Sequence, residues 1–310
     1  MSFSYELKKE LSMLVDTPRH CRIAELAAIA DHAGEISVER AVFSADNEAV
    51  TCAASLILKK IFARSFETEQ VSGRAAGKYQ ILIEDPDICS ELVKMLKLPA
   101  GGSGISEADR FALLTVKSCC KKAYLRGAFL CAGTISDPDR SYHLEINCKR
   151  KREADKAAAA FEALGIPAKS DKRSRYYSVY IKDSEMISDL LGAMGARVSL
   201  LELENKRILR SVRGDINRRV NCETANIEKT ANASARQIED IKFILDRGGK
   251  ELLSNGLDEI ARVRVEYPTA TLQELGEMFE PPLGKSCINH RLRKIARIAE
   301  NLREKGGNVV

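Results

Sequence analysis

The chain has no tryptophan, and aromatic residues make up only 5% of its 310 positions. It contains no run of eighteen apolar residues, which excludes a conventional transmembrane helix. The opening stretch MSFSYELKKELSML is polar along its length and has an amphipathic pattern, so it resembles neither a secretory signal nor a membrane anchor. These absences predict a cytoplasmic protein.

Paired cysteine motifs are also absent. None of the nine cysteines forms a Cys-x-x-Cys pair, and only Cys119 and Cys120 are close neighbours. Zinc sites usually take their ligands at such short spacings, so the pattern predicts no metal site and no cofactor. An odd number of scattered cysteines is typical of reduced, buried thiols in the cytoplasm.

The net charge is +5, and 45% of the residues are apolar. A chain of this length can form about two domains with ordinary cores. A mildly basic balance suits a nucleic-acid-binding protein, although many cytosolic enzymes are equally basic. The stretch SGRAAG at 72–77 lacks the ending of a phosphate-binding loop and predicts a hairpin turn.

An internal repeat organises the first two hundred residues. Residues 26–37 read LAAIADHAGEIS and residues 125–136 read LRGAFLCAGTIS. Each stretch is followed by strand and helix patterns in the same order, among them the strands ISVERAVFSA and SYHLEINC. This order predicts a pseudo-twofold α+β domain at 1–200, with repeats at about 21–98 and 120–196. Two unrelated alanine-rich helices are the alternative explanation of the short motifs.

Small residues at helical spacing would let the two repeated helices approach closely. These stretches resemble the LAGLIDADG motif of homing endonucleases, whose motif helices pack at the centre of a saddle of antiparallel strands. The resemblance places Ala33 and Ala132 where those nucleases carry metal-binding acids, and an alanine methyl group cannot bind metal. Asp31, Asp137 and Asp139 are nearby acids in non-equivalent positions. The resemblance therefore implies the scaffold without catalytic or metal-binding residues.

A charged linker helix is predicted at 201–216, followed by a helical domain at 217–310. In the helix that follows the linker, Ile227, Ala231, Ser234, Ile238, Ile241 and Leu245 are spaced along one face, and Gly248 and Gly249 end it. Asparagine is unfavourable inside a helix, so its polar residues indicate either a DNA-contacting surface or a solvated face. The candidate residues of this second surface are Arg218, Arg219, Asn226, Lys229, Asn232 and Arg236.

Residues 257–303 have the order of a helix-turn-helix. LDEIARVRVEYP predicts a helix stopped by Pro268, and TLQELGEMF begins with a capping box formed by Thr271 and Glu274. In the basic helix that follows, Ile288, Leu292, Ile295 and Ala299 form one stripe. The opposite face carries groups that can contact phosphates and base edges. The predicted DNA-binding residues are Lys285, Ser286, Asn289, His290, Arg293, Lys294 and Arg297.

The two parts together resemble the WhiA family of bacterial transcription regulators, over nearly the whole chain. The resemblance is carried by YLRGAFLCAGTISDP, SYHLEI, NRRVNCETANIEKT and KSCINHRLRKI. It implies a DNA-binding regulator of sporulation, or of cell division and chromosome segregation, located at the nucleoid. Double-stranded DNA is the expected partner, with other regulators or a sigma factor besides.

Two other classes of function remain open. One is a metal-dependent endonuclease, which Ala33 and Ala132 disfavour. The other is a scaffold whose saddle domain binds protein, with the helix-turn-helix carrying all DNA contacts.

Overall fold

The computed structural model describes residues 2–71, 78–99, 105–254 and 256–306. The chain divides into two compact units, Met1–Ser211 and Val212–Val310. The stretch at 72–77, for which the sequence predicts a hairpin turn, lies outside the described residues.

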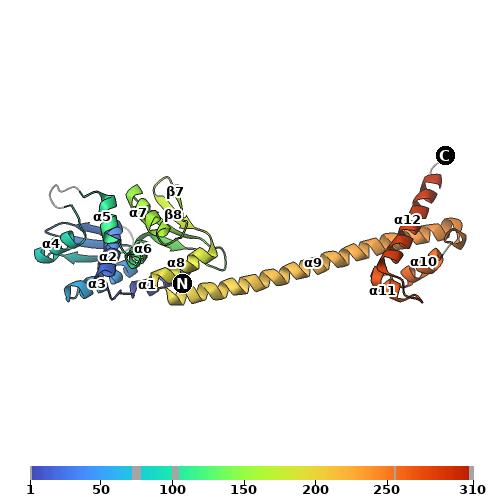
Figure 1. Cartoon of the computed structure of the whole chain (residues 1–310), viewed down its shortest axis with the longest axis horizontal. Helices are drawn as coiled ribbons and strands as arrows, with labels where there is room; N and C mark the ends of the chain where they lie inside the picture. The colour runs from blue at the N-terminus through green and yellow to red at the C-terminus, as the bar shows by residue number, and fades with distance from the viewer. Residues whose placement is uncertain (1, 72–77, 100–104, 255, 307–310) are drawn as a thin grey trace. The chain divides into compact units, whose positions relative to one another are not determined.

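The first unit is α+β and contains the same order of elements twice (Figure 1). Helix α1 (Phe3–Ser12) precedes the repeats, and α5 (Glu107–Leu114) lies between them. The first repeat comprises α2 (Arg19–Ala33), β1 (Gly34–Ile36), β2 (Ala41–Ala45), α3 (Glu48–Phe62), β3 (Glu69–Val71), β4 (Lys78–Ile83) and α4 (Pro86–Met95). The second comprises α6 (Ser118–Ala132), β5 (Gly133–Ile135), β6 (Leu144–Cys148), α7 (Lys151–Glu162), β7 (Lys169–Lys172), β8 (Tyr177–Ile181) and α8 (Ser184–Met194).

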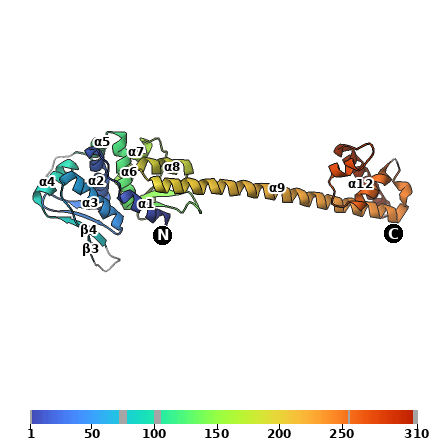
Figure 2. The same ribbon diagram turned by 90° about the horizontal axis from the view of Figure 1, so that it is seen from below.

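The two antiparallel sheets have matching topologies. Their strand orders are β1-β2-β4-β3 and β5-β6-β8-β7, and Figure 2 shows β3 beside β4. Gly34 pairs with Phe43 at the start of one sheet, and Gly133 pairs with Ile146 at the start of the other. The predicted pseudo-twofold α+β fold is therefore confirmed.

One strand prediction needs correction, and one strand was not predicted. ISVERAVFSA is not one strand: Ile36 ends β1 and Ala41–Ala45 forms β2, because Ser37 donates a hydrogen bond to the Arg40 carbonyl at 3.0 Å and closes a turn between them. In the second repeat, β7 has the sequence KSDK and is exposed on every residue. Such a strand has no apolar alternation, so the sequence pattern does not predict it.

The two motif helices, α2 and α6, pack directly against each other in the core of the first unit (Figure 1). A Cβ atom on Gly127 would lie 2.6 Å from the carbonyl oxygen of Glu25, so only glycine permits this approach. Ala27, Ala28 and Ala128 are completely buried in the same contact. The predicted close packing of the small-residue helices is confirmed.

Helix α9 runs from Arg197 to Gly248, where it ends as predicted. The boundary expected at residues 216 and 217 therefore falls inside one continuous helix. Leu203 belongs to the core of the first unit, whereas Ile241 and Ile244 belong to the core of the second.

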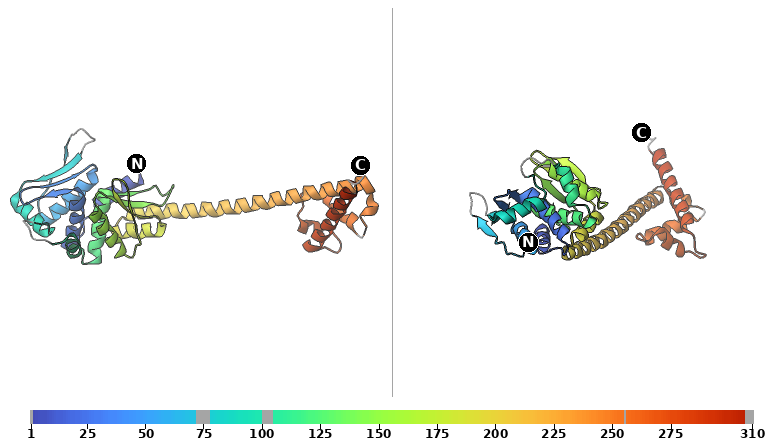
Figure 3. Two further views of the ribbon diagram at one scale, coloured as in Figure 1. Left: turned by 90° about the horizontal axis from the view of Figure 1, so that it is seen from above. Right: turned by 60° about the vertical axis from the view of Figure 1, so that its left-hand side comes forward.

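The second unit is all-α after α9. It contains the short 3-10 helix η1 (Lys250–Leu252), α10 (Leu257–Glu266), α11 (Leu272–Glu277) and α12 (Lys285–Gly306). Helix α10 ends just before Pro268, as predicted, because proline cannot continue the helix. Helix α12, drawn in red in Figure 3, is the longest of the helices that follow α9.

Candidate nucleic-acid interface

Helix α11 and the turn after it determine where α12 begins. Thr271 accepts a hydrogen bond from the Glu274 backbone at 3.3 Å, and Glu274 accepts one from the Thr271 backbone at 2.7 Å. This capping box is the one predicted from the sequence. A Cβ atom on Gly276 would lie 2.0 Å from the carbonyl oxygen of Leu283. The glycine therefore lets the turn pack onto α11 and lead into α12.

One face of α12 is buried. Ile288, Leu292, Ile295 and Ala299 are each at most 2% exposed and pack in the core of the second unit. The predicted apolar stripe is confirmed. Burying each of the larger side chains stabilises the unit by about 1.5–3 kcal/mol, so the stripe fixes which face of α12 points outward.

The residues predicted to bind DNA lie on the outward face of α12. All are exposed except Asn289, which is partly buried: Lys285, Ser286, Asn289, His290, Arg293, Lys294 and Arg297. Within the described ranges, none of the four cations of this face forms an ion pair. By contrast, Arg303 on the same helix pairs with Asp240 of α9 at 2.8 Å. The outward face thus offers uncompensated positive charge to an anionic partner.

Arg264 is buried inside the second unit and connects α10 to the loop before α11 and to α9. It is 2% exposed and donates to the Ala270 carbonyl at 2.8 Å, and burial lowers its pKa. Its other hydrogen bonds, to the Tyr267 carbonyl and the Ser234 hydroxyl, are both 3.4 Å long. Sequence reasoning missed this residue. The signal was its position on the same helical face as Leu257 and Ile260.

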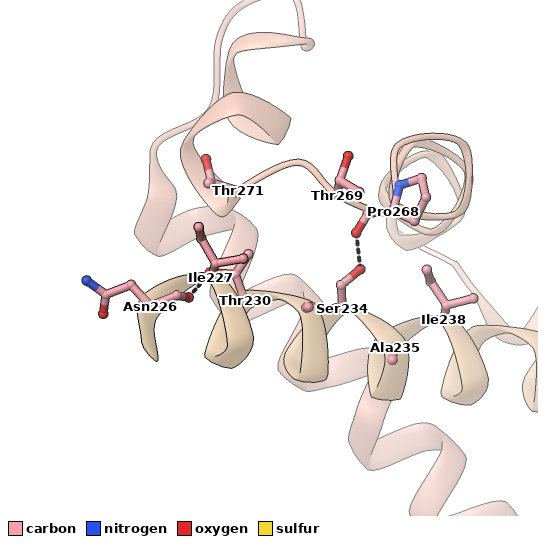
Figure 4. Close-up of a pocket in the computed structure, with 10 residues that line it drawn as sticks. Asn226, Ile227, Thr230, Ser234, Ala235, Ile238, Pro268, Thr269 and Thr271 are labelled. Carbon is pink, nitrogen blue, oxygen red and sulfur yellow. Dashed lines mark hydrogen bonds between the residues drawn. The ribbon is translucent and has the colours of Figure 1, made fainter. Parts of the chain in front are cut away.

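A groove lies between α9 and the loop before α11 (Figure 4). The Ser234 hydroxyl donates to the Pro268 carbonyl at 2.5 Å across it. Ile227, at one end of the predicted helix face, lines the groove and is 69% exposed. Leu245 is also partly exposed, at 38%. On this predicted face of α9, Ser234 and Ile241 are buried. The other helices of the second unit cover the face only around these residues.

The second set of candidate residues lies along the exposed surface of α9. Arg218 pairs with Asp215 at 2.5 Å, and the Asn226 amide lies 3.7 Å from the Cys222 sulfur. In Figure 4 the Asn226 side chain points away from the groove. All six members are exposed: Arg218, Arg219, Asn226, Lys229, Asn232 and Arg236. These six side chains are therefore accessible to a partner, but they lie on α9 and form a surface separate from the outward face of α12.

A pocket lies at the end of α2 and α6 that corresponds to a nuclease centre. Ala33 and Ala132 line this pocket together with Lys8, Lys78 and Lys149. Burial lowers the pKa of Lys8. Asp46 is the one acid among the residues that line this pocket in the described part of the chain. This pocket therefore has lysine ammonium groups around the two alanines that replace the acids.

Asp31, the nearest acid of α2, is held in a buried network. Its carboxylate accepts from Arg110 at 2.6 Å, Lys156 at 3.0 Å and the Tyr124 hydroxyl at 3.1 Å. Burial works to raise the pKa of Asp31, but the charges of Arg110 and Lys156 outweigh it and bring the pKa below 3.8. Asp137 and Asp139 are exposed and pair with Lys206. These acids are therefore engaged in ion pairs.

The described helices include none that is long and apolar enough to cross a membrane.

Comparisons with known proteins match both parts of the chain. The family model described as the WhiA LAGLIDADG-like domain matches residues 121–213, and the WhiA C-terminal HTH domain matches residues 216–299. The "Probable cell division protein WhiA" of Desulforamulus reducens is 42% identical over 98% of this chain and 97% of that protein. The protein of the same name in Lachnoclostridium phytofermentans is 39% identical over 98% of this chain and 100% of that protein.

A solved structure agrees with these matches. The structure described as "full-length DUF199/WhiA from Thermatoga maritima" is 28% identical, with a TM-score of 0.60, and the match covers 97% of this chain and 99% of that chain. A family model for an HTH domain thus covers the helices of the second unit, in agreement with the predicted helix-turn-helix. Sequence identity over almost the full length and the shared architecture show that this chain belongs to the WhiA family.

Proposed function

We propose that this chain is a sequence-specific DNA-binding transcription regulator that controls sporulation, or cell division and chromosome segregation. The observation that carries the proposal is the outward face of α12, where four cations form no ion pair with any acid in the described part of the chain and the opposite stripe is buried. In helix-turn-helix proteins the corresponding helix lies in the major groove. The cell-division role is supported by the names of the relatives.

The outward face divides into two kinds of contact. Arg293 lies at the centre of the face and is proposed to donate two hydrogen bonds to a guanine edge, with Ser286, Asn289 and His290 beside it. Lys285, Lys294 and Arg297 are proposed to contact phosphates, which orient the helix without reading sequence. The face therefore supplies both affinity and specificity.

A second surface on α9 is proposed to extend the contact with DNA. Its cations and amides are exposed. Asparagine is unfavourable in the interior of a helix, so its presence there indicates a role other than helix stability. The residues proposed for this weaker contact are Arg218, Arg219, Asn226, Lys229, Asn232 and Arg236.

We propose that the chain has no nuclease activity. Phosphodiester hydrolysis by this scaffold needs carboxylate-bound divalent metal at the ends of the two motif helices. Ala33 and Ala132 stand at those ends, and Asp31 is neutralised by Arg110 and Lys156.

We also propose that the first unit binds other regulators or a sigma factor at the nucleoid.

Genome-wide mapping of the DNA bound by this protein in its own cells tests the proposal. We expect discrete sites upstream of division, segregation or sporulation genes, and altered transcription of those genes when Arg293→Ala replaces the parent chain. An Arg303→Ala chain, which loses a cation paired to Asp240, is the matched control. Uniform DNA occupancy, or discrete sites that are unchanged in the Arg293→Ala chain, would contradict the proposal.

A further inference from the structure

Four potential metal ligands meet at the beginning of the two motif helices, at the opposite end from Ala33 and Ala132. They are His20 and Cys21 on α2 and Cys119 and Cys120 on α6, and their ligand atoms all lie within 4.8 Å of one another. The His20 Nδ1 lies 3.2 Å from the Cys120 sulfur and 3.3 Å from the Cys21 sulfur. The distances bring two residues of each repeat into one cluster.

The cluster follows the internal symmetry of the chain. His20 and Cys119 are 99 positions apart, as are Cys21 and Cys120, and the glycines Gly34 and Gly133 that end the same helices have this spacing too. Each repeat thus supplies one exposed and one buried ligand from the same helical positions. If the four side chains were close together by chance, they would not need to occupy equivalent positions in the two repeats.

The surroundings suit a bound cation with thiolate ligands. Cys21 and Cys120 pack against Ala24 and Ala123 in a small buried cluster, whereas His20 and Cys119 are exposed and leave a path from solvent. Cys119 is one of two exposed cysteines, with Cys222, for which the predicted burial is wrong.

The separations between the four ligand atoms are similar to those of a tetrahedral zinc site. A tetrahedral zinc site has Zn–S bonds of about 2.3 Å and Zn–N bonds of about 2.0 Å, so its ligand atoms are about 3.5–3.8 Å apart. The two nitrogen–sulfur separations of 3.2 and 3.3 Å are close to these values, and the other ligand atoms lie within 4.8 Å of one another. Only small side-chain movements would therefore be needed to complete the tetrahedron.

We propose that His20, Cys21, Cys119 and Cys120 form a structural Zn²⁺ site that joins the two repeats at the start of α2 and α6. Three sulfurs and one imidazole are the donor set of closed structural zinc sites, which leave no open coordination position. The site would therefore hold the helix pair together rather than catalyse a reaction. Spacing rules for zinc motifs miss it because each ligand pair is adjacent in sequence and the pairs meet only in the fold.

The test is metal binding by the full chain, purified under reducing conditions, stripped with a chelator and titrated with Zn²⁺ and with Co²⁺ as a spectroscopic probe. We expect one ion per chain, with Co²⁺ giving the absorption of tetrahedral thiolate coordination. Cys119→Ser and His20→Ala, both at exposed ligands, should each weaken binding at least about tenfold. Cys222→Ser, at the other exposed cysteine, is the matched control and should bind like the parent.

Thermal unfolding supplies a second readout that does not depend on DNA binding. Zn²⁺ should raise the Tm of the parent and of Cys222→Ser, and should leave that of Cys119→Ser unchanged. Binding of less than one ion per chain, equal affinity in Cys119→Ser and Cys222→Ser, or a disulfide within the cluster of the metal-free protein under reducing conditions would overturn the proposal. These outcomes leave the proposed DNA-binding function to be judged separately.

Discussion

Arg126 on α6 donates hydrogen bonds to both carboxylate oxygens of Glu25 on α2, at 2.8 and 2.5 Å. Glu25 is completely buried, and Arg126 also donates to Asp16 at 2.5 Å and to the Met194 carbonyl at 3.1 Å. The two helices that carry alanines at the nuclease position are therefore joined by a buried ion pair. Neither residue was singled out from the sequence, because the pair joins positions far apart in the chain.

Removing Arg126 should destabilise the first unit strongly. Arg126→Ala leaves the Glu25 charge buried without its partner, which costs about 3–5 kcal/mol of unfolding free energy. The double variant Arg126→Met with Glu25→Leu should recover much of that loss, since no charge remains buried. Urea unfolding followed by circular dichroism measures both.

The exposed pair of Arg19 and Glu91 provides the control for that measurement. Their side chains are 58% and 52% exposed, so Arg19→Ala should cost less than about 1 kcal/mol. Equal losses for Arg19→Ala and Arg126→Ala would contradict this account of the helix pair.

Acid should weaken the network around Asp31. Its pKa is below 3.8 in the folded chain, so its stabilising contribution is present above about pH 4 and is lost as the pH falls through the lowered value. Asp31→Asn should lower Tm at neutral pH and flatten the decline of Tm on the acid side. Tm measured from pH 7 to pH 2 for both proteins tests this. Parallel curves for parent and variant would show that Asp31 does not contribute to the pH dependence.

The absence of nuclease activity is directly measurable. Purified protein incubated with supercoiled plasmid and Mg²⁺ or Mn²⁺ should leave the plasmid intact, because Ala33 and Ala132 cannot bind metal. An Asp31→Asn preparation serves as the control for contamination, since a contaminating nuclease would cut equally in both. Nicking that survives stringent purification and disappears in Asp31→Asn would mean that this acid is catalytic.

Limited proteolysis tests the proposed division into a domain at 1–200, a linker at 201–216 and a domain at 217–310. The middle of α9 is exposed from residues 217 to 229 and lies outside both hydrophobic cores. Cleavage should therefore begin there and release two fragments that resist further digestion. If both fragments were degraded as fast as the first cut appears, the two parts would not be independently stable.

The elements with strong periodicity could be predicted from the sequence. The apolar stripe from Ile288 to Ala299 predicts α12 because its spacing matches a helix, and the repeated motif predicts α2 and α6. β7 could not be predicted, because all four of its residues are polar and exposed. The 69% exposure of Ile227 could not be predicted either, because periodicity shows which residues share a helix face but not how much of that face other helices cover. The cluster at His20 depends on contacts between repeats, which no local spacing reveals.

The central claim is that α12 reads DNA through its outward face, and binding of single variants to cognate and random duplexes across a salt series tests it most directly. Arg293→Ala should cost about 1–3 kcal/mol on the cognate site and relax preference there. Arg297→Ala should weaken all duplexes similarly and reduce the salt slope by about one unit. Leu292→Asp should unfold the helix-turn-helix, since it buries a charge in that core.

The control in this measurement is Arg303→Ala, which removes the same charge from the same helix where it pairs with Asp240. Circular dichroism confirms that each arginine variant is folded before binding is compared. We expect Arg293→Ala and Arg297→Ala to lose affinity for DNA as described, and Arg303→Ala to bind DNA like the parent. The central claim is contradicted if both outward-face variants bind like the parent at every salt concentration.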